Sequence, residues 1–355
     1  MTHRLERLQA LLAAQRLDAL LVGALPNVRY LTGFTGSAGY LVVCQGGAVL
    51  YVDGRYAEQA SREFAGGAVT TTPRDILGGV LASLSDRRPA RLGVEAAHLS
   101  YEAWRRIADT ASGVEVAPTA GLVEGLRARK DAEEVAALRR AIAITDQAYE
   151  DCLTWIAPGL SEGEVAARCE YFQRSRGADR KETRTAVGSG PRSALPHCIA
   201  ADRRTAADEP VLLDLGCTVH GYTSDLTRTV FLGRPPEAFV RIHRIVAEAQ
   251  ALAIQAIRPG VEGRAVHAIA AQCIARHGYG DRFPHALGHS IGLNIHERPQ
   301  LSPTETQSLE PGNVVTVEPG IYLPGRFGVR TEDVVLVTEA GCEMLSRAPR
   351  DLATV

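Results

Sequence analysis

The stretch VLLDLGCTVHGYTSDLTRTV, residues 211–230, contains two apolar runs that each carry one aspartate. Both runs are rich in β-forming residues, and His220-Gly221 between them suits a tight turn, so the stretch predicts a β-hairpin. With that turn, Asp214 and Asp225 fall on one face of the hairpin, because side chains alternate between faces along a strand. A carboxylate in an apolar strand is costly unless it is paired, hydrogen-bonded or bound to a cation. The stretch therefore predicts two carboxylates that converge on one interior site.

A second acidic pair follows later in the chain. Glu318 ends the run VVTVE at 314–318, and Glu332 precedes the run DVVLV at 333–337. A chain return centred on Gly325 would place these two glutamates opposite each other. Four carboxylates in one interior repel one another by several kcal/mol even at an effective dielectric constant of about 20. Divalent metal ions would remove that repulsion, so the two pairs together predict a metal site.

Three histidines lie between the acidic pairs, in FPHALGHSIGLNIHE at 283–297. One of His285, His289 and His296 could be a neutral ligand, which would leave the others as acid or base groups. Four carboxylates with one imidazole form a hard ligand set that favours Mn²⁺, with Co²⁺ or Zn²⁺ as alternatives. Two ions that share a bridging water are the arrangement that uses so many carboxylates. Taken singly, each residue has a simpler reading: an aspartate that bonds the end of a hairpin, or two histidines that are neighbours on a helix.

The region around these motifs is internally repeated. Pro259 lies 101 positions after Pro158, and each begins a segment that predicts a helix. The Glu-Pro pair that opens the strand before Asp214 recurs at Glu310, again 101 positions after Glu209. The repeat predicts a duplicated α/β unit whose halves face each other about a pseudo-twofold axis, each half supplying one acidic pair.

The sequence before this region predicts a separate, smaller α/β domain. Two β-rich runs at 39–45 and 48–53 are separated by Gly46-Gly47 and predict a hairpin. Helical patterns at 75–85 and 101–111 flank a strand at 91–95, and a long helix is expected from 126 to about 155. We therefore expect an N-terminal domain at 1–125 and a C-terminal domain at 126–355.

Composition excludes several classes of protein. The chain has 355 residues, of which 45% are hydrophobic and 23% charged, enough for two domains. No apolar run is long enough to span a bilayer and the N-terminus lacks a signal-peptide core, so we expect a cytoplasmic protein without membrane contact. A net charge of −2 does not favour nucleic-acid binding, and seven scattered cysteines without a CxxC motif indicate reduced thiols.

These residues resemble the catalytic domain of the methionine aminopeptidase, prolidase and aminopeptidase P superfamily. The motifs that carry the resemblance stand in family order and cover most of 185–335: SGPRSALPH at 189–197, LDLG at 213–216, SDLTRT at 224–229, HALGHSIGL at 285–293, IHE at 295–297, VEPGIY at 317–322 and VRTED at 329–333. The resemblance implies a C-terminal α+β domain with the pita-bread fold. It also implies a creatinase/prolidase-like N-terminal domain and a homodimer.

The resemblance further implies roles for individual residues. The ligands of two divalent metal ions would be Asp214, Asp225, His289, Glu318 and Glu332. Three histidines would surround the substrate and the tetrahedral intermediate outside the ligand set, namely His197, His285 and His296, with Arg330 beside them. Glu318 would also relay a proton from a metal-activated hydroxide to the leaving group.

The N-terminal domain indicates the branch of the superfamily. YLTGFTGSAG at 30–39 and VDGRYAEQA at 52–60 resemble the extra domain of small bacterial proline-directed peptidases. The expected function is an Xaa-Pro aminopeptidase, which cleaves the bond between an N-terminal residue and a penultimate proline. The alternative is an Xaa-Pro dipeptidase (prolidase), and an inactive pita-bread protein that binds peptides or proteins is the third reading. The substrate would be a proline-containing peptide.

Overall fold

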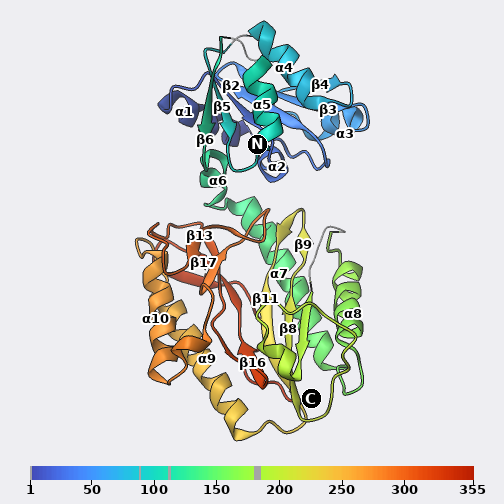
Figure 1. The fold of residues 1–355 in the computed structure, drawn as a ribbon, viewed down its shortest axis with the longest axis vertical. Coiled ribbons are helices and arrows are strands. Elements are labelled where there is room, and N and C mark those ends of the chain that lie inside the picture. Colours follow the sequence, from blue (N-terminus) through green and yellow to red (C-terminus); the bar gives the residue numbers. More distant parts are fainter. Residues whose placement is uncertain (1, 88, 111–112, 180–184) are drawn as a thin grey trace. The chain divides into compact units, whose positions relative to one another are not determined.

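The computed structural model describes residues 2–87, 89–110, 113–179 and 185–355. The chain divides into two compact units, Met1–Arg127 and Ala128–Val355, drawn in Figure 1. Within the described ranges, no helix is both long enough and apolar enough to cross a membrane.

The N-terminal unit is built on a six-stranded mixed sheet with the order β4-β3-β2-β1-β5-β6. Its elements are α1 (Thr2–Ala14), β1 (Ala19–Val22), α2 (Leu25–Thr32), β2 (Tyr40–Cys44), β3 (Gly47–Asp53), α3 (Ala57–Glu63), β4 (Ala68–Thr72), α4 (Ile76–Arg87), β5 (Arg91–Glu95), α5 (Tyr101–Thr110), β6 (Glu115–Thr119) and α6 (Leu122–Arg127). The predicted β2–β3 hairpin forms, but its turn is one residue earlier than predicted. Gly47 already pairs with Cys44, which leaves Gln45 and Gly46 as the turn.

The long helix predicted from residue 126 begins later than expected. Residues 122–127 form the separate helix α6, and α7 (Ala132–Leu153) begins after Asp131. The Asp131 side chain accepts a 2.9 Å bond from the Glu134 backbone N–H, and the Glu134 side chain accepts a 2.9 Å bond from the Asp131 backbone N–H. This capping box satisfies free N–H groups at the start of a helix, so α7 begins here as a helix separate from α6.

The C-terminal unit contains two helix pairs and two main sheets, with the orders β11-β8-β7 and β13-β12-β14-β17-β18. Its remaining elements are α8 (Glu162–Ser175), β7 (Ala186–Ser189), η1 (Gly190–Ala194), β8 (Glu209–Leu215), β9 (Thr218–Val219), β10 (Tyr222–Thr223), β11 (Leu226–Leu232), α9 (Glu237–Ala256), α10 (Gly263–Arg276), η2 (Gly280–Arg282), β12 (Gly288–Ser290), β13 (Glu297–Leu301), β14 (Val314–Val317), β15 (Gly320–Leu323), β16 (Phe327–Arg330), β17 (Asp333–Val337) and β18 (Cys342–Met344).

The internal repeat of the sequence is a structural repeat. Helices α8 and α10 are both 14 residues long and begin 101 residues apart. In each half a helix pair packs on the strands that follow it: α7 and α8 share one apolar core with β7, β8 and β11, whereas α9 and α10 share another with β14 and β17. Figure 1 shows the two helix pairs on opposite sides of the strands within this unit. The predicted fold class, an α/β N-terminal domain followed by a duplicated α+β domain, is confirmed.

The hairpin predicted from residues 211–230 forms as expected. Strands β8 and β11 are antiparallel with Asp214 opposite Thr227. Between them β9 and β10 close on His220 and Gly221, whose φ angles of 51° and 79° are both positive. Positive φ at both central residues is typical of a type I′ turn, whose twist matches the flanking strands. This register places Asp225 on the same face as Asp214.

The second acidic pair lies where one ladder ends and another begins. Val317 of β14 pairs with Asp333 of β17, and Gly320 of β15 pairs with Arg330 of β16. The same register runs through both ladders, so the residues between them, including Glu318 and Glu332, lie opposite each other as predicted.

Candidate metal centre

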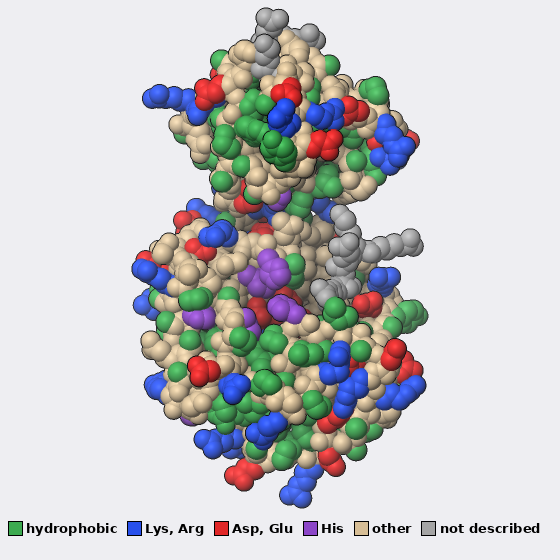
Figure 2. All heavy atoms as spheres, viewed as in Figure 1, with side chains coloured by type: hydrophobic (Ala, Val, Ile, Leu, Met, Phe, Trp, Pro, Cys, Tyr) green, Lys and Arg blue, Asp and Glu red, His purple; other side chains and the backbone are tan. Residues whose placement is uncertain are grey.

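A cavity of about 410 Å³ lies in the C-terminal unit. All nine residues that the sequence singles out line it: His197, Asp214, Asp225, His285, His289, His296, Glu318, Arg330 and Glu332. Figure 2 shows purple histidine atoms around a hollow in which red carboxylate atoms are visible. Residues that are more than 130 positions apart in the sequence therefore share one site.

Three side chains have the geometry of a metal-binding cluster. The donor atoms of Asp225, His289 and Glu332 all lie within 4.8 Å of one another. Nε2 of His289 is also 3.4 Å from Oε1 of Glu318 and 3.7 Å from Oδ2 of Asp225. Asp214 completes the acidic group and contacts the guanidinium of Arg330. Carboxylate and imidazole donors converge here as a divalent cation requires.

The strand β12 presents His289 with Nε2 facing the carboxylates of Asp225 and Glu318. Nδ1–H donates to the carbonyl of Ser290 at 3.2 Å, which leaves the lone pair of Nε2 directed to the carboxylates. Because residues 288–290 form a strand, the reading of His285 and His289 as helix neighbours is wrong. Gly288 allows the close approach of β12 to β14: a Cβ there would lie 2.0 Å from the Thr316 carbonyl oxygen.

Glu332 provides a direct test of whether the residues fit a cation. It is buried, with 2% of its surface exposed. Its Oε2 accepts a 2.6 Å bond from Thr227 Oγ1, whereas Oε1 has no hydrogen-bond partner among the described residues. A buried carboxylate oxygen without a partner is costly, and a metal ion would satisfy it. The donor set thus fits a divalent cation.

The pKa values of the carboxyls in the metal-free site also indicate that the site lacks positive charge. Burial raises the pKa of Glu318 to about 7, although Arg330 opposes the rise. Burial also raises the pKa of Asp225, with Asp214 adding to the effect, and that of Glu332, with Asp225 adding to it. The carboxyls resist ionisation together because charged oxygens in a dry, shared site repel one another. A divalent cation would reverse this preference.

A chain of hydrogen bonds joins Arg330 to His285. Arg330 Nη1 donates to the Tyr322 hydroxyl at 3.0 Å, and that hydroxyl is 2.9 Å from Nε2 of His285. His285 Nδ1–H donates to the Ala286 carbonyl at 2.7 Å. Burial lowers the pKa of His285 to about 4, so the imidazole is neutral near pH 7 and its Nε2 accepts from Tyr322. Both ring nitrogens are therefore engaged within the protein.

The other two histidines border the cavity more openly. His296 packs edge-to-face on His289, with ring centroids 4.3 Å apart, and burial lowers its pKa. His197 is exposed and follows Pro196, whose carbonyl accepts a 2.8 Å bond from Arg330 Nη1. Both imidazoles line the cavity.

Sequence reasoning missed two residues of this site, Thr227 and Tyr322. Thr227 bonds both Glu332 and Arg330, and Tyr322 bonds both Arg330 and His285. Each lies an even number of positions from a predicted ligand within a β-rich run, Thr227 two after Asp225 and Tyr322 four after Glu318. This even spacing places each residue on the same strand face as a predicted ligand, and it could have indicated both residues from the sequence.

Comparison with known proteins identifies the family. Residues 136–339 match metallopeptidase family M24, and residues 4–129 match the creatinase/prolidase N-terminal domain. An Xaa-Pro dipeptidase of Pyrococcus furiosus is 36% identical over 99% of this chain and 100% of its own.

Solved structures agree over the whole chain. The Xaa-Pro dipeptidase from Bacillus anthracis superposes with a TM-score of 0.96 at 38% identity, covering 99% of both chains. An X-Pro aminopeptidase from Thermotoga maritima superposes with a TM-score of 0.93 at 34% identity, again over 99% of both chains. The duplicated domain is thus the pita-bread fold, preceded by a creatinase/prolidase-type domain. The chain therefore belongs to metallopeptidase family M24 and is a metal-dependent exopeptidase.

Proposed function

We propose that this protein is an Xaa-Pro dipeptidase, which hydrolyses dipeptides whose second residue is proline. Full-length similarity to Xaa-Pro dipeptidases carries the proposal, at 36% and 34% identity for two Pyrococcus enzymes and 38% for the Bacillus anthracis structure. The cavity of about 410 Å³ lies toward the small end of the range for ligand pockets, about 300–1,000 Å³, which suits a short peptide.

The aminopeptidase expected from sequence motifs is the second candidate. The X-Pro aminopeptidase from Thermotoga maritima favours it, since that structure also covers the whole chain. The two activities share the same bond and the same metal chemistry, and differ in whether residues beyond the proline are accepted. Of the four relatives named here, three are Xaa-Pro dipeptidases and one is an X-Pro aminopeptidase, so we place the dipeptidase first.

The proposed cofactor is a pair of divalent ions, and Mn²⁺ is our choice because the ligands are hard oxygen donors with one imidazole. The proposed ligands are Asp214, Asp225, His289, Glu318 and Glu332. The convergence of His289 with Asp225 and Glu332, and the unpaired Oε1 of Glu332, support this assignment. The homodimer and the cytoplasmic location stay predictions.

When bound, the two cations would supply the positive charge that acidifies a water molecule and polarises the scissile carbonyl. Glu318 would accept a proton on its carboxylate and pass it to the prolyl nitrogen, which leaves poorly until it is protonated. His197 and His296 would orient the substrate by donating to its carbonyl oxygens.

The contacts of Arg330 and His285 suggest the role of each in this proposal. Arg330 bonds Asp214, Tyr322, Thr227 and the Pro196 carbonyl, so it organises the site as a fixed positive group. His285 has both ring nitrogens engaged by Ala286 and Tyr322. We therefore assign His285 to holding Tyr322 and Arg330, rather than to donating a hydrogen bond to the substrate.

Kinetics with two substrates tests the proposal. The Mn²⁺-loaded protein is assayed with Ala-Pro and with Ala-Pro-Ala. We expect kcat/KM for the dipeptide to exceed that for the tripeptide at least tenfold. A preference for the tripeptide would establish the aminopeptidase instead, and turnover of neither would refute proline-directed exopeptidase activity.

A further inference from the structure

The segment that carries His197 has few contacts of its own. Residues 195–200 lie in neither a helix nor a strand. Two arginines donate to its carbonyl oxygens, one on each side of His197: Arg330 to Pro196 at 2.8 Å and Arg192 to Ile199 at 2.6 Å. The position of the imidazole therefore depends on these two side chains.

Apolar packing does little to hold this segment. Leu195 and Ile199 are 48% and 64% exposed, although both are large and apolar. Cys198 is buried, and its sulfur accepts a 3.3 Å bond from Arg192 Nη2. Because exposed side chains contribute little burial energy, polar anchors have to fix the backbone.

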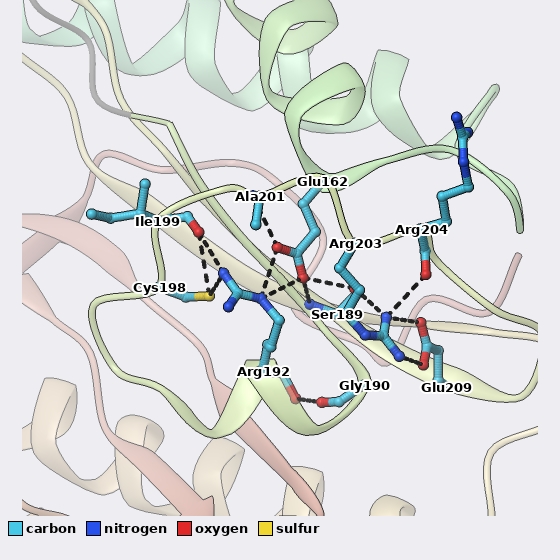
Figure 3. A network of polar contacts seen from close by, with 11 residues as sticks. Glu162, Ser189, Gly190, Arg192, Cys198, Ile199, Ala201, Arg203, Arg204 and Glu209 are labelled. Atoms are coloured by element: carbon cyan, nitrogen blue, oxygen red, sulfur yellow. Dashed lines mark hydrogen bonds and ion pairs between the residues drawn. The ribbon is translucent and has the colours of Figure 1, made fainter.

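The anchor at Arg192 is itself fixed by a buried carboxylate, shown in Figure 3. Glu162, at the first turn of α8, is fully buried. It accepts bonds from the Ser189 backbone and hydroxyl at 2.8 Å and from the Ala201 backbone at 3.1 Å. It also accepts from Arg192 Nε, at 3.1 Å to Oε1 and 2.9 Å to Oε2. One carboxylate thus holds Ser189, Ala201 directly after the segment, and the arginine that donates to Ile199 within it.

The geometry points to Arg192 as a positioning residue for peptide hydrolysis. With Nε on Glu162 and Nη2 on the Ile199 carbonyl, its guanidinium holds the segment so that His197 faces the substrate. The guanidinium makes these contacts through two different nitrogens in a rigid plane, whereas lysine carries all its N–H donors on one nitrogen and cannot occupy both positions. The inference rests on the proposed peptidase function, and on the role that this function gives to His197.

The same network contains a matched control. Arg203 has 30% of its side chain exposed, against 32% for Arg192, and it also pairs with a carboxylate, Glu209, at 2.6 Å. Its side chain bonds Ser189 and the Arg204 carbonyl but none of residues 195–200 in the described structure. Arg203 therefore tests for general loosening of this region without direct loss of the Ile199 bond.

The experiment compares Arg192→Lys with Arg203→Lys, because lysine keeps a positive charge opposite each carboxylate and so protects folding. We expect Arg192→Lys to lower kcat/KM for Ala-Pro at least tenfold at unchanged Mn²⁺ content, and Arg203→Lys to lower it less than twofold. In a His197→Ala background, Arg192→Lys should cost less than twofold further, because the residue through which it acts is gone. Hydrogen exchange in peptides spanning 193–201 should quicken in Arg192→Lys only.

Two results would overturn the inference. One is an equal loss of kcat/KM from Arg192→Lys with and without His197, which would show that Arg192 acts independently of that imidazole. The other is unchanged exchange in 193–201, which would show that the bond to Ile199 does not hold the segment. The exchange measurement needs no substrate, so it still tests Arg192 if the wild-type protein hydrolyses no Xaa-Pro peptide and the proposed function fails.

Discussion

Thr227 Oγ1 donates a 2.6 Å hydrogen bond to Oε2 of Glu332 and accepts one from Arg330 Nε at 3.0 Å. One buried hydroxyl thus orients a proposed metal ligand and the cationic group beside it. Removal of a residue that hydrogen-bonds a metal ligand, without binding the metal itself, commonly lowers metal affinity by roughly 10–100-fold.

We expect Thr227→Val to weaken Mn²⁺ binding by roughly 10–100-fold, measured by calorimetry on the metal-free protein. Thr227→Ser should retain most of the affinity, since it keeps the hydroxyl. Thr229→Val is the matched control: Thr229 lies on the same strand and is also buried, but it bonds only the backbone of Arg330. Equal losses of affinity in Thr227→Val and Thr229→Val would show that orientation of Glu332 is not the cause.

Removal of one acidic charge should stabilise the metal-free protein while abolishing its activity. Burial and the neighbouring Asp214 raise the pKa of Asp225. A carboxyl with a raised folded-state pKa favours folding while protonated and loses that contribution as pH rises through the folded-state pKa. Metal-free Asp225→Asn should therefore melt above metal-free wild type at pH 8, with a smaller difference at pH 5. A lower melting temperature at pH 8 would contradict the electrostatic reading.

Metal binding should release protons in a pH-dependent way. The pKa of Glu318 is raised to about 7 in the metal-free site, so this carboxyl is largely protonated at pH 6 and largely ionised at pH 8. Because a metal binds the ionised form, the apparent Mn²⁺ affinity should rise from pH 6 to pH 8. Calorimetry in two buffers of different ionisation enthalpy counts the protons released, which should be more at pH 6. Equal proton counts at both pH values would exclude this linkage.

Tyr322→Phe should interrupt the chain of hydrogen bonds that joins Arg330 to His285. The substitution removes the hydroxyl that bonds Arg330 Nη1 and His285 Nε2 but keeps the ring. We expect kcat/KM to fall about tenfold and the free energy of unfolding to fall by about 1–3 kcal/mol, since two buried polar atoms lose a partner. Unaltered kcat/KM would mean that the hydroxyl contributes only to stability.

The two halves of the duplicated domain are joined by a buried ion pair. Arg228 Nη2 lies 2.7 Å from Asp333 Oδ1, and the two side chains are 3% and 1% exposed. Asp333→Ala would leave a buried guanidinium without its partner and should cost about 3–5 kcal/mol in urea denaturation. Glu343→Ala removes the exposed partner of Arg139 and should cost less than about 1 kcal/mol. If both substitutions lowered the free energy of unfolding by a similar amount, burial would not determine how much an ion pair contributes to stability.

The sequence by itself predicted the fold class and the two acidic pairs that line the cavity, and local physics explains the acidic pairs. Alternation along strands placed Asp214 beside Asp225, and the symmetry of a return about Gly325 placed Glu318 opposite Glu332. An acidic residue in an apolar strand is conspicuous because its burial is costly, so the motif marks the site before any contact is known.

Only the tertiary structure decided how the side chains pair, because those contacts join segments from different parts of the chain. The hydroxyl of Thr227 meets a glutamate 105 positions away, and Arg192 reaches across to Glu162 and Ile199. The engagement of both nitrogens of His285 depends likewise on Tyr322, 37 positions away. Periodicity specifies the face on which a residue lies, whereas hydrogen-bond partners depend on distances that packing alone determines.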